Sequence, residues 1–115
     1  MDQSQFSAEL AQQISMFLIA TYSQGQSLTP EQLWAQAGGT DEAPDMFGNP
    51  ESGSSQAYFA LTIVTKTCSS QRDEFESQGN AVAAQMFQSM GEVAYRASLV
   101  SSPMRGILDM MTGDD

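Results

Sequence analysis

Ala81–Val100, which reads AVAAQMFQSMGEVAYRASLV, carries the clearest helical pattern in the chain. Its main apolar residues recur at spacings of four, four, three, four and three positions: Val82, Met86, Met90, Val93, Ala97 and Val100. Polar residues recur at spacings of four, three and four positions: Gln85, Ser89, Glu92 and Arg96. Because about 3.6 residues make one α-helical turn, each series lies on one face of a helix. The stretch therefore predicts a helix with an apolar seam and a separate polar stripe.

A third strip of the same helix has almost no side-chain bulk. Ala84, Gly91 and Ser98 lie seven positions apart, and residues this small let a neighbouring helix approach closely. Two interpretations are open. If another helix of the chain covers the strip, the protein is a self-contained bundle. If the strip is exposed, these three residues form a docking surface for a partner.

The N-terminal segment predicts a long helix from about Gln3 to Ser23, followed by Gly25 as its terminator. One helical face is marked by spacings of four, four, three and four positions: Phe6, Leu10, Ile14, Phe17 and Thr21. The second half of this helix is rich in apolar residues. We therefore expect it to be buried on more than one side.

A short helix is predicted next, because Thr29, Pro30 and Gln32 form a start signal. Thr29 is placed as the N-cap, Pro30 at the first helical position, and Gln32 completes a capping box. The helix is expected to reach about Ala37 and to stop at Gly38–Gly39.

The segment after the loop predicts a second long helix that begins at Ser54 or Ser55. Its Thr62–Thr67 portion, TIVTKT, is rich in β-branched residues and resembles a strand. Helix is favoured because neither glycine nor proline occurs from Ser54 to Gln78, a span too long for an ordinary strand. Gly79–Asn80 is expected to end this helix and to cap the next one.

Together these elements predict an all-α fold, a small helical bundle of three long and two short helices within a single domain, 1–115. The fifth helix is expected at Pro103–Met111, and the acidic tail 112–115 is expected to be flexible. A long Gly/Pro-rich loop is predicted at 38–53. Its bulky apolar residues and those of the fifth helix are further candidates for partner contact: Met46, Phe47, Met104, Ile107, Leu108 and Met111.

The charge of the chain excludes one class of partner. Fourteen acidic residues face four basic ones, which gives a net charge of −10. Direct nucleic-acid binding requires arrays of Lys and Arg, and this sequence has none. A strongly acidic protein instead favours solubility and basic partners.

The residue types also argue against an enzyme. The chain has no histidine and one cysteine, Cys68, so a zinc site of Cys and His, an internal disulfide and a Ser-His-Asp triad are all excluded. Cys68 is placed on the apolar face of its helix and is interpreted as a buried, inert thiol. The acidic segment 41–51 lacks the EF-hand spacing, and Asp73, Glu74 and Glu76 are interpreted as solvated. We expect no catalytic residue, no cofactor and no metal.

The sequence also bears on the location of the protein. The N-terminus MDQSQF has no basic residue, so we expect no secretory signal. The apolar run Ile14–Ala20 is too short to span a bilayer. With its lone cysteine, the chain is expected to be a soluble cytoplasmic protein without membrane contact.

Three hypotheses of function follow. The first is a non-enzymatic protein–protein interaction or assembly protein, such as an adaptor, a virion-type subunit or a chaperone-like binder, that docks or self-associates through helix surfaces. The alternative is an acidic inhibitor that blocks a basic, nucleic-acid-binding surface of a partner protein. A third is a small-ligand site inside the bundle, lined by aromatic residues that are more often plain core: Phe17, Trp34, Tyr58 and Phe87.

Overall fold

The structure is a computed structural model that describes residues 3–40 and 53–100, with side chains from 8 to 40 and from 55 to 100. Four helices make up this part of the chain: α1 (Gln3–Ser23), α2 (Pro30–Gln36), α3 (Gly53–Ser77) and α4 (Ala81–Ser98). No strand occurs among the described residues, so the predicted all-helical class is confirmed for them. The predicted helix 103–111, most of the 38–53 loop and the tail 112–115 lie outside the described residues.

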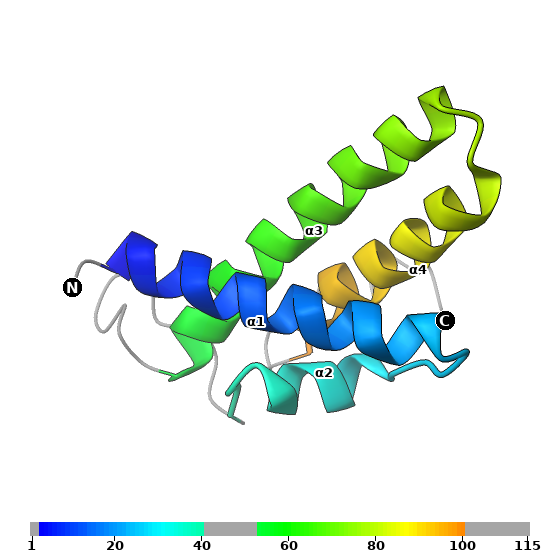
Figure 1. Ribbon diagram of the computed structural model, residues 1–115. Coiled ribbons are helices and arrows are strands. Elements are labelled where there is room, and N and C mark those ends of the chain that lie inside the picture. Colours follow the sequence, from blue (N-terminus) through cyan, green and yellow to red (C-terminus); the bar gives the residue numbers. More distant parts are fainter. Residues whose placement is uncertain (1–2, 41–52, 101–115) are drawn as a thin grey trace, which may run out of the picture.

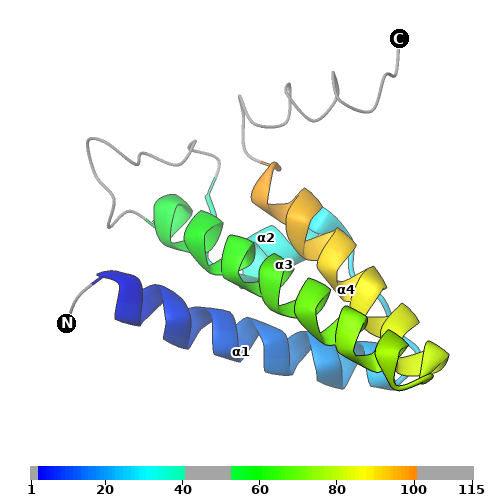
Figure 2. The same cartoon turned by 90° about the horizontal axis from the view of Figure 1, so that it is seen from above.

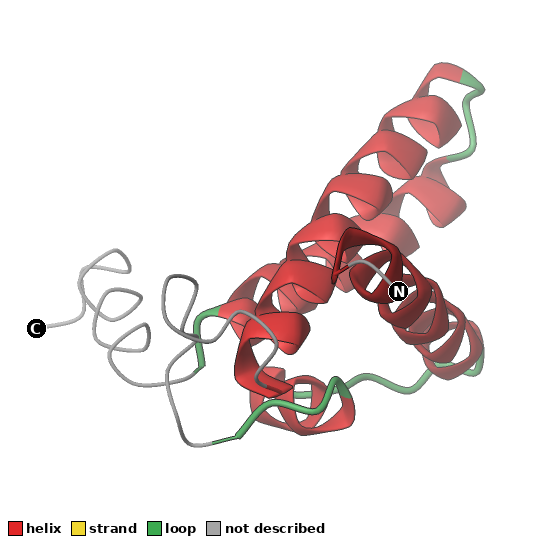
Figure 3. Cartoon of the chain, turned by 90° about the vertical axis from the view of Figure 1, so that its left-hand side faces the viewer, coloured by secondary structure: helices red, strands yellow, loops and turns green. Residues whose placement is uncertain are grey.

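The helices α3 and α4 form an antiparallel hairpin against which α1 and α2 pack (Figure 1). α1 contacts mainly α3 and touches α4 less extensively, whereas α2 contacts α4. Figure 2 shows α1 beside α3, and Figure 3 shows the turn of the α3–α4 hairpin extending away from α1 and α2. The base of the hairpin is therefore covered by α1 and α2, and neither helix covers its tip.

The turn between α3 and α4 is fixed by the residues that the sequence indicated. Gly79 adopts a φ of 77°, a left-handed conformation that glycine tolerates. The Asn80 N–H donates to the Phe75 carbonyl oxygen at 2.9 Å, which closes the C-terminus of α3. The Asn80 side-chain oxygen accepts from the Ala83 N–H at 3.2 Å and caps α4. The predicted turn is confirmed, and Asn80 serves both helices.

The start of α2 is also confirmed as a capping box. The Gln32 N–H donates to Thr29 Oγ1 at 3.1 Å, and the Thr29 N–H donates to Gln32 Oε1 at 3.0 Å. At the other end, Gly38 has a φ of 92° and Gly39 lies against Trp34, where a Cβ on Gly39 would overlap the indole ring. The indole N–H of Trp34 donates to the Thr40 carbonyl oxygen at 2.9 Å.

The β-branched segment Thr62–Thr67 is helical, as predicted. Its threonine hydroxyls donate back to the carbonyl oxygens of the preceding turn: Thr62 to Phe59 at 2.7 Å and Thr65 to Leu61 at 2.8 Å. These bonds satisfy the side chains within the helix, so strand-like composition does not prevent helix formation.

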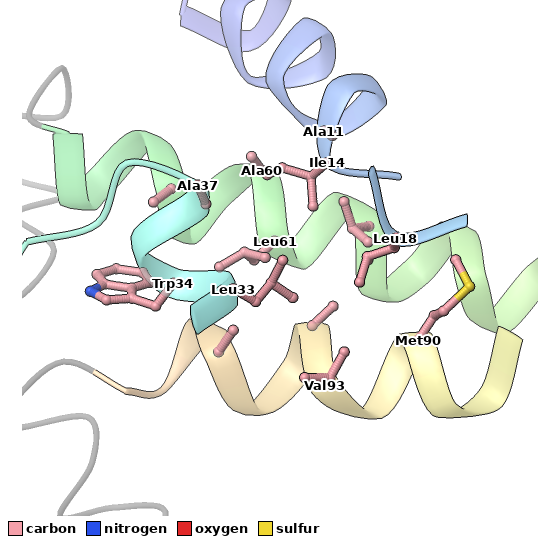
Figure 4. Close-up of a cluster of buried hydrophobic side chains, with 14 of the residues drawn as sticks. Ala11, Ile14, Leu18, Leu33, Trp34, Ala37, Ala60, Leu61, Met90 and Val93 are labelled. Atoms are coloured by element: carbon pink, nitrogen blue, oxygen red, sulfur yellow. The ribbon is translucent and has the colours of Figure 1, made fainter. Parts of the chain in front are cut away.

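The core lies where the four helices meet (Figure 4). Its largest fully buried apolar side chains come from all four helices: Leu18, Leu33, Leu61, Val64 and Met90. Burying each such side chain stabilises the fold by about 1.5–3 kcal/mol. The inward residues predicted for the short helix, Leu33, Trp34 and Ala37, are all buried, which confirms that α2 is held by docking.

Two predictions about burial are wrong. Val82, placed in the apolar seam of α4, is 83% exposed because it lies in the first turn, at the bare tip of the hairpin. α1 was expected to be buried on more than one side, yet Met16 is 64% exposed and Ile19 is 39% exposed. Because α3 and the edge of α4 cover only one side of α1, a second apolar surface is left open.

Candidate interaction surface

The small-residue strip of α4 is largely buried within the chain. Ala84 and Ser98 are buried, and Gly91 is half-buried. A Cβ added to Gly91 would lie 3.3 Å from the Cβ of Cys68 on α3. Of the two interpretations, this burial favours the self-contained packing. The other predicted interaction residues lie outside the described residues: Met46, Phe47, Met104, Ile107, Leu108 and Met111.

Cys68 occupies the interface of α3 and α4 and is buried, as predicted. Its burial raises the pKa of the thiol from 9.0 to about 11, because desolvation disfavours the charged thiolate. A thiol that stays protonated near neutral pH is a poor nucleophile.

The acidic cluster at the end of α3 is exposed to solvent. Asp73, Glu74 and Glu76 are all exposed. Arg72 donates to Asp73 at 3.0 Å in an ion pair on the surface. Within the described residues, no group of three acidic or cysteine side chains is arranged to hold a metal ion. The predicted solvation of these carboxylates agrees with their positions.

Three of the four aromatic residues of the third hypothesis, Trp34, Tyr58 and Phe87, belong to the packing of the bundle. Trp34 is buried in the core, and Phe87 stacks on Phe75 with ring centroids 5.5 Å apart. One surface hollow is an open groove between α3 and α4, lined among others by Thr65, Phe87 and Tyr95.

Among the described side chains of α1, from 8 to 23, Met16 is the most exposed large apolar one, and it belongs to a regular series that sequence analysis missed. Gln12, Met16, Ile19 and Ser23 recur at spacings of four, three and four positions, and all four are exposed. We call this series the α1 outer stripe. Its residues lie on a different face of α1 from the buried residues Ile14 and Leu18. The helix α1 itself lies at the edge of the molecule (Figure 2). The spacing of this series is visible in the sequence. The series through Ile14 is equally regular, and the sequence analysis assigned the packed face of the helix to that series instead.

The α1 outer stripe lies in an uncharged part of the chain. No charged residue occurs between Glu9 and Glu31. The strong negative charge of the protein is instead concentrated elsewhere, and many of its acidic residues fall in segments outside the described structure: Asp2, Asp41, Glu42, Asp45, Glu51, Asp109, Asp114 and Asp115. The stripe therefore offers apolar contact without the cost of desolvating a charge.

Comparison of the chain with protein-family models, with curated proteins and with solved structures gave no match. Among the described residues, no helix has both the length and the apolar character needed to cross a membrane.

Proposed function

We propose that this protein is a non-enzymatic interaction or assembly protein that docks on another protein through a helix surface, and that this surface is the α1 outer stripe. The observation that carries the proposal is the exposure of Met16, 64%, and Ile19, 39%, at helical spacing within the segment 10–30, which contains no charged residue. Single exposed apolar side chains are common on protein surfaces. Two of them at i and i+3 match part of the anchor pattern with which an amphipathic helix binds a groove.

The chemistry of the stripe supports apolar docking. Methionine is flexible and polarisable, so Met16 can fit an irregular partner surface. Burial of apolar area contributes about 25 cal/mol per Å². The flanking Gln12 and Ser23 can form hydrogen bonds at the rim of an interface, as polar residues do in known complexes.

The proposal is tested with the full chain in three forms. Met16→Glu/Ile19→Glu places two charges on the stripe, and Val82→Glu is the control, because Val82 is an exposed apolar residue on another helix. Self-association is measured by sedimentation, and hetero-complexes are measured by affinity capture from the host followed by binding of the purified partner. We expect a complex that the stripe variant loses and that Val82→Glu retains. Complexes that the stripe variant retains in full would overturn the proposal.

A second candidate is the acidic inhibitor of a basic, nucleic-acid-binding surface, favoured by the net charge of −10. The exposed carboxylates Asp73, Glu74 and Glu76 are suitable contacts on the described surface. Salt separates the two functions, because a complex held by many charges weakens steeply with ionic strength and apolar docking does not. Binding that survives 1 M salt, where the Debye length is about 3 Å, would exclude the inhibitor.

A further inference from the structure

We draw no further inference here: the strongest candidate, the open groove beside the α3–α4 turn that Glu76, Gln88 and Glu92 help to line, is a cluster of acidic and amide side chains, and nothing in the structure shows what would bind there.

Discussion

α4 and α1 are both long helices with a second packing surface, but they use it in opposite ways. On α4 the second surface is the small strip of Ala84, Gly91 and Ser98, which is largely buried and approaches α3 closely at Gly91. On α1 the second surface contains the bulky residues Met16 and Ile19, and no described helix covers it. The contrast teaches that small residues mark the closest contact within this bundle. Bulky residues on α1 instead lie on a face that no described helix covers.

Met90→Ala is expected to have the largest effect on stability and tests the buried side of this contrast. Met90 on α4 is fully buried, and Met90→Ala should lower the free energy of unfolding by about 2–5 kcal/mol through lost burial and a cavity. Urea denaturation monitored by circular dichroism measures this change. A loss below about 1 kcal/mol would show that the core around α4 is not packed as described.

Gly91→Leu is expected to have the next largest effect. A Cβ at this position already lies within 3.3 Å of the Cys68 Cβ, so the larger side chain must push α3 and α4 apart. We expect a loss of about 1–3 kcal/mol in the free energy of unfolding, and Gly91→Ala should cost less. Both variants are compared by thermal unfolding. Full stability of Gly91→Leu would mean that the strip is open after all.

The same interface should show a pH dependence. Burial raises the pKa of Cys68 to about 11, so the folded state prefers the protonated thiol more than the unfolded state does. Its contribution to stability is complete below pH 9 and is lost as the pH rises from about 9 to 11. Urea titrations of the wild-type chain and Cys68→Ala separate this effect from the other titrating groups. Parallel pH curves for the two proteins would contradict the burial of the thiol.

The smallest effect on stability is expected for Met16→Ala. Because Met16 is 64% exposed, its removal should change the free energy of unfolding by less than about 0.5 kcal/mol. The matched comparison with Met90→Ala uses the same residue change and the same urea assay. A loss from Met16→Ala as large as that from Met90→Ala would place Met16 in the core.

Local signals in the sequence predicted the helices well. The capping box at Thr29 and the Gly79–Asn80 turn depend on residues a few positions apart, so they can be read without knowing the fold. Helix rather than strand at Thr62–Thr67 followed from the absence of glycine and proline around it. The inward residues of α2 were also predicted correctly.

The remaining features depended on which helices lie beside each other. The sequence showed two surfaces on α4 but could not say that α3 would cover the small strip. It overestimated the burial of Val82, because a regular seam does not reveal where the neighbouring helices end. The α1 outer stripe was missed for the same reason: apolar content indicated two-sided burial, whereas only one side has a neighbour.

Methionine oxidation followed by mass spectrometry tests the central contrast most directly, because Met16 and Met90 are read in one sample. In dilute solution under mild peroxide, we predict that Met16 oxidises rapidly and Met90 remains protected. Equal oxidation rates for Met16 and Met90 would contradict the account.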